Sequence, residues 1–165
     1  FIAGNHDYWV LDFMKKKLMN HTYFDDTTFS LRGKNFYITH GDGVLSWDYG
    51  YRILKKIIRS PFFIWCFRLL HPTLAYKIAR KVSRTENHPE LPEEVREKIR
   101  NELKKYALTH FQKGFDYMVC GHYHLNEIID VEKGKLAVLG DWQDDPSYAV
   151  FDGKELTLHQ WENDA

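Results

Sequence analysis

The sequence has little cysteine, no long apolar run and no net charge, and each absence narrows what the chain can be. Its two cysteines, Cys66 and Cys120, lie far apart and follow no metal-binding spacing. We therefore expect buried thiols in a reducing cytoplasm rather than disulfides. No run of about 18 uncharged apolar residues occurs, which argues against a membrane-spanning helix. The 23 basic residues balance the 23 acidic ones, so we expect no nucleic-acid partner.

The rest of the composition is typical of a soluble globular protein. Hydrophobic residues make up 44% of the 165 positions and charged residues 28%, and there are no internal repeats or low-complexity tracts. A chain of this length can bury a substantial core. We therefore predict a single domain over residues 1–165.

Hydrophobic patterning predicts a mixed α/β domain with a helical insertion. Helical spacing favours helices over 8–20, 47–84 and 92–113, the last beginning at Pro92. Apolar runs bounded by turn residues predict strands between and after these helices. The predicted strands are 1–3, 29–31, 35–39, 116–120, 127–131, 136–139, 148–151 and 156–161.

Three short motifs follow predicted strands in a fixed order. They are Gly4-Asn5-His6-Asp7, Thr39-His40-Gly41-Asp42 and Gly121-His122-Tyr123-His124. Taken alone, the first can be a helix N-cap and the second a turn. The third is stronger, because it projects two imidazoles from one loop. Together they predict a site with two divalent metals, which lower the pKa of a bound water and stabilise charge during phosphoester hydrolysis.

In these motifs the chain resembles the C-terminal part of the calcineurin-like metallophosphoesterase superfamily. The resemblance implies a layered α/β/β/α sandwich and two divalent metals, with Mn preferred and Fe or Zn also suited to the ligands. It assigns Asn5, His40 and His122 to one metal and His124 to the other. The superfamily's opening motifs, Asp-x-His and Gly-Asp-x-x-Asp, do not stand upstream of Gly4-Asn5-His6-Asp7 in the given sequence, which begins at Phe1. We therefore expect a longer natural protein and little catalysis from this portion alone.

The resemblance also implies roles for three residues beside the metal ligands. His6 would lie next to the substrate phosphate, as a transition-state stabiliser or proton donor. Asp7 would fix the tautomer and orientation of the His6 ring. Asp42 would orient the His40 ring without itself binding a metal. The remaining histidines have no partner motif, and we interpret them as surface or packing residues.

The insertion between the second and third motifs, about 47–113, is predicted to form a helical lid. Residues 51–84 contain nine Lys or Arg and no Asp or Glu, with several aromatics between them. Such a segment suits a membrane surface or an anionic amphiphile, and an ordinary pair of packed amphipathic helices is the alternative. The candidate substrate-binding residues of the lid are Tyr51, Arg52, Arg80 and Arg84.

Within the superfamily, the chain is most similar to the UDP-2,3-diacylglucosamine diphosphatases of lipid A biosynthesis. The likeness rests on a helical lid of similar length, its opening with Asp48, Tyr51 and Arg52, the segment Leu139-Gly140-Asp141-Trp142 and the closing strands. One residue departs, since the best-characterised branch has Arg at the position of His6. An Arg would supply a permanent charge, whereas a His can also transfer a proton.

This resemblance implies cleavage of UDP-2,3-diacylglucosamine to UMP and 2,3-diacylglucosamine 1-phosphate. The partner would be an anionic lipid-linked nucleotide, and the enzyme would be cytoplasmic and peripheral to the inner membrane. Two alternatives stay open at this point. One is a general metallophosphoesterase acting on soluble nucleotides or phosphoproteins. The other is a binding protein or fragment without a complete dimetal site. The sequence gives no oligomeric state.

Overall fold

The centre of the computed structural model is a five-stranded mixed sheet. The model describes residues 1–7, 13–83, 91–142 and 145–161. The strands of the sheet are β1 (Thr27–Leu31), β2 (Lys34–Thr39), β3 (Tyr117–Cys120), β4 (Glu127–Val131) and β5 (Gly134–Val138). Their order is β1-β2-β3-β5-β4, with β2, β3 and β5 parallel and the two edge strands antiparallel. The sheet confirms the mixed α/β class that the patterning predicts.

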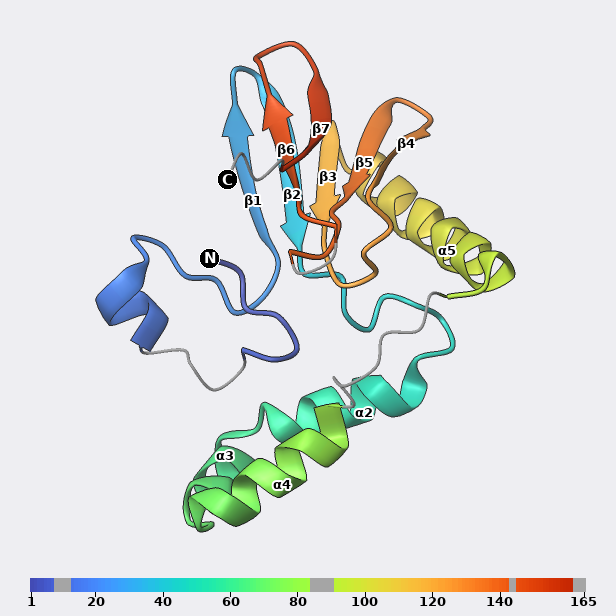
Figure 1. Cartoon of the computed structure of the whole chain (residues 1–165). Helices are drawn as coiled ribbons and strands as arrows, with labels where there is room; N and C mark the ends of the chain where they lie inside the picture. Colours follow the sequence, from blue (N-terminus) through green and yellow to red (C-terminus); the bar gives the residue numbers. More distant parts are fainter. Residues whose placement is uncertain (8–12, 84–90, 143–144, 162–165) are drawn as a thin grey trace.

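The two faces of this sheet are covered by different elements (Figure 1). On one face lies α5 (Glu93–Phe111), whose Ile99, Leu103 and Ala107 belong to the same buried cluster as residues of β3, β4 and β5. On the other face lies a hairpin of β6 (Ser147–Phe151) and β7 (Leu156–Gln160), which contributes Leu156 to a second cluster. Side chains alternate between these clusters because successive strand residues point to opposite faces. The second helical layer of the predicted sandwich stays a prediction.

Three further helices lie apart from the sheet, beyond the carboxyl ends of its parallel strands (Figure 1). They are α2 (Tyr49–Ile58), α3 (Pro61–Arg68) and α4 (Pro72–Ser83). The sequence predicts helix throughout 47–84, and the breaks fall where a proline begins a new helix. No residue of α2 or α3 is buried. Because α5 packs on the sheet, the part of the predicted insertion 47–113 that stands away from the core is α2 to α4.

The segment before β1 is less regular than the sequence predicts. The strand expected over 1–3 is wrong, because only an isolated bridge joins Ile2 to Tyr23. The Ala3 amide donates a hydrogen bond to the Tyr23 carbonyl, and the Tyr23 amide donates one to the Phe1 carbonyl. Both bonds involve the single residue Tyr23, so the pairing does not extend into a strand. Of the helix expected over 8–20, the described part contains a short π-helix, η1 (Met14–Leu18), and residues 8–12 lie outside the described residues.

The two cysteines differ in burial. Cys120, in β3, is fully enclosed, and burial raises the pKa of its thiol to about 12, as expected for an inert core residue. Cys66, in α3, is only half-buried, so the predicted burial holds for one thiol of the two. Both are free thiols. Among the described residues, no helix is long and apolar enough to cross a membrane.

Candidate metal and phosphate site

The second and third motifs meet because β2 and β3 run parallel in register. Thr39 lies opposite Cys120 at the carboxyl end of the pair, so His40 and Gly121 leave the sheet side by side. The Gly121 amide donates a hydrogen bond of 3.2 Å to the His40 carbonyl. The edge formed by the carboxyl ends of parallel strands is where α/β sheets place their ligands. The fold therefore puts two of the three predicted motifs at one site.

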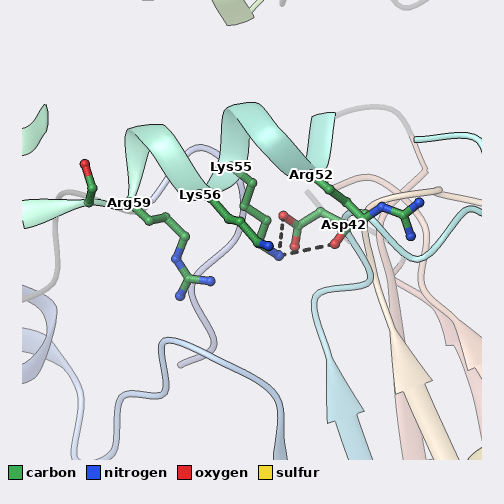
Figure 2. A pocket seen from close by; sticks show the side chains of 7 residues that line it. Asp42, Arg52, Lys55, Lys56 and Arg59 are labelled. Atoms are coloured by element: carbon green, nitrogen blue, oxygen red, sulfur yellow. Dashed lines mark hydrogen bonds and ion pairs between the residues drawn. The ribbon is translucent and has the colours of Figure 1, made fainter. Parts of the chain in front are cut away.

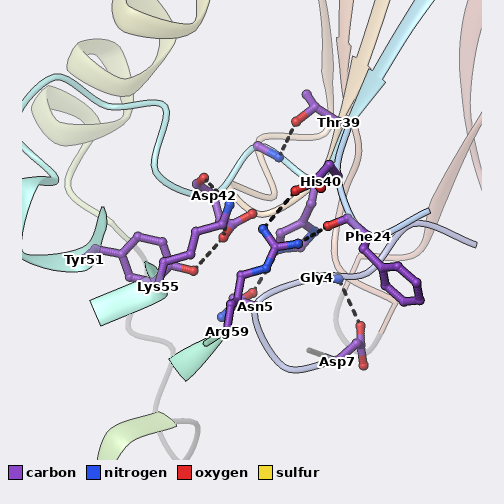
Figure 3. Close-up of polar contacts among 12 residues, drawn as sticks. Gly4, Asn5, Asp7, Phe24, Thr39, His40, Asp42, Tyr51, Lys55 and Arg59 are labelled. Atoms are coloured by element: carbon purple, nitrogen blue, oxygen red, sulfur yellow. Dashed lines mark hydrogen bonds and ion pairs between the residues drawn. The ribbon is translucent and has the colours of Figure 1, made fainter. Parts of the chain in front are cut away.

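The first motif reaches the same site through Asn5. Its Oδ1 lies 2.9 Å from Nε2 of His40 (Figure 3). The ring of His40 lies 5.1 Å from that of His122, centroid to centroid. Close approach depends on Gly4, because a Cβ at that position would lie only 2.8 Å from Cε1 of His40. All three residues predicted to share one metal are thus brought together.

The loop that carries His122 and His124 has an unusual backbone. Both histidines and Asn126 adopt left-handed conformations, with φ of 63°, 48° and 51°. Such conformations cost energy for residues with a Cβ, and they persist where the surroundings hold them. Here, Asn126 donates a side-chain hydrogen bond of 2.5 Å to Asp145. His124 Nδ1 lies 3.3 Å from an Asp141 carboxylate oxygen, a partner that can orient its ring.

The two inner histidines are neutral at physiological pH. Burial lowers the pKa of His40, and it lowers that of His122 to about 4, with the neighbouring His40 adding to the effect. The nearby ammonium of Lys55 lowers both pKa values further, while the Asp42 carboxylate opposes this. Neutral imidazole is the form that binds metals. The site is therefore poised to accept a cation without first releasing protons.

Asp42 connects this site to the first lid helix. Its carboxylate accepts a 2.7 Å hydrogen bond from the Tyr51 hydroxyl and forms a 2.8 Å ion pair with Lys55 (Figure 3). The Lys55 ammonium also donates to the Asp42 carbonyl at 3.2 Å. Since the Asp42 side chain is only 4% exposed, these contacts compensate a buried charge. The predicted role of Asp42 in orienting His40 stays a prediction.

Two cavities adjoin Asp42, and lid residues line both. The larger, about 480 Å³, lies along α2 and is lined by Arg52, Lys55, Lys56 and Arg59, among others (Figure 2). The smaller, about 90 Å³, is lined by His40 as well as by Lys55 and Arg59. The cations of α2 therefore reach the same edge of the sheet as the histidines.

The remaining predicted lid residues are placed differently from one another. Arg52 donates to the Ser46 carbonyl at 3.1 Å and lies over the Tyr49 ring. Arg80 lies over the ring of Tyr76, on α4. Arg84 lies outside the described residues. Tyr51 and Arg52 are thus close to the site, and Arg80 belongs to a more distant helix.

The first motif places its other two residues at the edge of the site. His6 is exposed, and the Asp7 carboxylate accepts a 3.3 Å hydrogen bond from the Gly4 amide, which closes the turn around Asn5. Asp7 therefore fixes the backbone that presents Asn5 to His40. Its predicted role in holding His6 stays a prediction, as does the role of His6 toward phosphate.

The donors present fit part of a metal site. Within the described residues, no three His, Cys, Asp or Glu side chains gather closely enough to form a complete cluster. The 2.9 Å between Asn5 Oδ1 and His40 Nε2 nevertheless matches adjacent ligands that lie about 2.1 Å from one octahedral ion. Amide oxygen and neutral imidazole suit Mn, Fe or Zn. These donor types are the ones that the resemblance implies for half of a dimetal site, and the role of Asn5, His40 and His122 as ligands stays a prediction; the three are called the histidine half-site below.

Comparison with known proteins gives the family. No family model matches the chain. The "UDP-2,3-diacylglucosamine hydrolase" of Porphyromonas gingivalis is 32% identical over 99% of this chain and 68% of its own length. The chain belongs to the UDP-2,3-diacylglucosamine hydrolase family. Family proteins of the same name from Pseudomonas putida and Aeromonas salmonicida are 28% and 27% identical, over 84% and 97% of this chain.

Membership of the UDP-2,3-diacylglucosamine hydrolase family confirms the predicted closeness to these proteins and to the metallophosphoesterase superfamily. The chain spans 59% and 64% of the lengths of the Pseudomonas and Aeromonas proteins. It therefore spans between 59% and 68% of the lengths of these three relatives.

The sequence did not single out Lys55, Lys56 and Arg59 as site residues. They were counted only among the nine basic residues of 51–84. Together with Arg52, however, they are spaced three and four residues apart along α2 and its C-cap. This spacing places all four on one side of a helix and was the available signal. Asp141 was noted for the family segment it belongs to, but nothing in the sequence pairs it with His124.

Proposed function

We propose that this protein is a metal-dependent hydrolase that cleaves UDP-2,3-diacylglucosamine at its diphosphate. The products would be UMP and 2,3-diacylglucosamine 1-phosphate. The observation that carries the proposal is the convergence of Asn5, His40 and His122 at the carboxyl edge of β2 and β3. The names of the relatives supply the substrate class.

Each motif has a defined part in the proposed reaction. Asn5, His40 and His122 would hold one metal and His124 the other, with Asp141 orienting the His124 ring. When bound, two divalent metals supply a water of lowered pKa and stabilise charge on the attacking and leaving oxygens. His6 would stabilise the transition state or donate a proton. Asp42, held by Tyr51 and Lys55, would keep the His40 loop in place.

The lid provides a surface suited to a lipid-linked substrate. Several of its large apolar side chains are exposed, among them Phe62 at 74%, Trp65 at 59% and Leu69 at 67%. Such residues can bury acyl chains or enter a membrane surface while neighbouring cations bind phosphates. This supports peripheral contact with the inner membrane from the cytoplasm.

The test is hydrolysis by the full-length protein with added Mn²⁺. UDP-2,3-diacylglucosamine in detergent would be compared with a soluble diester, bis-p-nitrophenyl phosphate. Release of UMP would be measured for the first substrate and release of p-nitrophenol for the second. We expect UMP from the lipid substrate, strongly reduced in Asn5→Ala and retained in Asn101→Ala. Asn101 is an exposed residue of α5, away from the motifs, and serves as the matched control.

The two substrates separate the proposed function from its main alternative. Cleavage of the diester without cleavage of the lipid substrate would indicate a general metallophosphoesterase and reject the lipid assignment. Hydrolysis that is equally fast in Asn5→Ala would instead reject the motif residues as the site.

A further inference from the structure

The basic side of α2 faces the site, with Lys55 and Arg59 partly buried and Lys56 exposed at its edge. Lys55, Lys56 and Arg59 project from one side of the helix toward the loops that carry the motifs (Figure 2). The apolar residues Ile53 and Ile57, which are 63% and 47% exposed, occupy another side of the helix. The helix thus separates a surface for apolar partners from a surface for charged ones.

The cavity on this basic side has an excess of positive charge. Four cations line it, and among the lining residues that the structure describes Asp42 is the only acidic one. Lys55 and Arg59 are only 24% and 26% exposed, so their charged groups are partly withdrawn from water. Arg59 is held in position by an ion pair of 3.0 Å with Asp25 and by a hydrogen bond to the Phe24 carbonyl. Cations that are desolvated and concentrated in this way favour binding of an anion.

The position of the cavity indicates which anion it serves. It shares Asp42, Lys55 and Arg59 with the smaller cavity that His40 lines. A group bound among the α2 cations would therefore be a close neighbour of a group bound at the histidine half-site. The two phosphoryl groups of a diphosphate are joined through one oxygen, so they could occupy these two adjacent positions together.

We propose that Lys55, Lys56 and Arg59 form a phosphate subsite for the phosphoryl group of the substrate that water does not attack. This inference rests on the proposed diphosphate hydrolysis. The subsite would bind the second phosphate before cleavage and would hold the extra negative charge that this group gains as the P–O–P bridge breaks. It would also distinguish a diphosphate from a simple phosphodiester, which has no second phosphoryl group to place there.

The decisive variant is Lys56→Gln in the full-length protein. Lys56 is exposed and lines only the larger cavity, whereas removing Lys55 would leave the buried Asp42 without its ion pair. We expect KM for UDP-2,3-diacylglucosamine to rise about tenfold, and Lys56→Glu to raise it at least as much. Hydrolysis of bis-p-nitrophenyl phosphate should be unchanged. Lys77→Gln, the same change on α4, is the matched control and should leave both substrates unaffected.

A binding measurement keeps this test independent of the proposed function. Inorganic pyrophosphate would be titrated calorimetrically into the wild type and both glutamine variants. Weaker binding in Lys56→Gln alone supports the subsite, even if the wild type fails to cleave the lipid substrate. An equal loss on both substrates, or unchanged KM and pyrophosphate affinity, would overturn it. So would unchanged KM with lost binding to phosphatidylglycerol vesicles, which would assign these cations to membrane headgroups.

Discussion

At the scale of single residues, the site depends on a glycine whose lack of a side chain leaves room for a neighbouring ring. Gly4 lies against the ring of His40, and its neighbour Asn5 presents the oxygen that faces His40 Nε2. The turn is closed by the Asp7 carboxylate, which accepts a hydrogen bond from the Gly4 amide. In the motif Gly-Asn-His-Asp, Asn5 thus supplies the oxygen that faces His40, Gly4 leaves space for the ring, and Asp7 fixes the turn.

Gly4→Ala should disrupt the site more than the size of a methyl group suggests. The new Cβ would fall 2.8 Å from His40 Cε1, so the ring or the turn must shift. We expect a loss of about 1–3 kcal/mol in unfolding free energy, with weaker Mn²⁺ binding. Denaturant unfolding and metal titration measure both. Gly50→Ala, in α2 where an added Cβ meets nothing, is the control, and destabilisation there of equal size would refute the steric explanation.

Stability of the metal-free protein should fall in mild acid because of His122. The pKa of this side chain is about 4 in the folded protein, whereas a histidine in an unfolded chain titrates near pH 6.5. Between these values only the unfolded state binds the proton, so acid favours unfolding. The contribution is fully present above about pH 6.5 and is lost as the pH falls to about 4. Its size is on the order of 3 kcal/mol.

Denaturant unfolding between pH 7 and pH 4 measures this effect. His122→Gln should flatten the pH dependence, whereas His159→Gln, at an exposed position in β7, should not. Identical slopes in the two variants would show that His122 is not the titrating group.

At the scale of elements, the helices of the insertion have two different roles. α5 contributes Leu103, which is fully buried, to the core of the sheet. α2 instead contacts the core through polar groups, chiefly Tyr51 and Lys55 on Asp42. A helix that is held by a few polar contacts can move relative to the sheet more easily than one whose apolar stripe is buried.

This difference predicts unequal effects for the same substitution. Leu103→Ala should lower the unfolding free energy by about 2–5 kcal/mol, because it leaves a cavity under α5. Leu74→Ala, in α4 where the side chain is 49% exposed, should change it by no more than about 0.5 kcal/mol. Denaturant unfolding of both variants gives the comparison. A large loss at Leu74 would mean that α4 is packed as tightly as α5.

The sequence predicts most elements because their patterns are local. The strands over 35–39 and 127–131 and the start of α5 after Pro92 follow from apolar runs and helix-start residues. The strand over 1–3 failed because a strand needs a neighbour, and composition does not reveal whether one is present. The contact of Lys55 with Asp42 was also unpredictable, since it depends on how α2 sits against a loop thirteen residues earlier in the chain.

At the scale of the whole molecule, the parallel pairing of β2 and β3 brings the second and third motifs together, and the Asn5–His40 contact adds the first. The helix α2 then extends the site with its cations. The motif order indicated the family resemblance, and that resemblance predicted this assembly. The separation between the core and the lid helices was visible only in three dimensions.

The most direct test of the account is whether lipid hydrolysis requires metal at these motifs. The full-length protein would be stripped of metal with a chelator, and UMP release from UDP-2,3-diacylglucosamine would be followed before and after Mn²⁺ is returned. We predict that activity disappears and then recovers, and that His122→Ala does not recover. Full activity in the metal-free protein, or equal recovery in His122→Ala, would contradict the account.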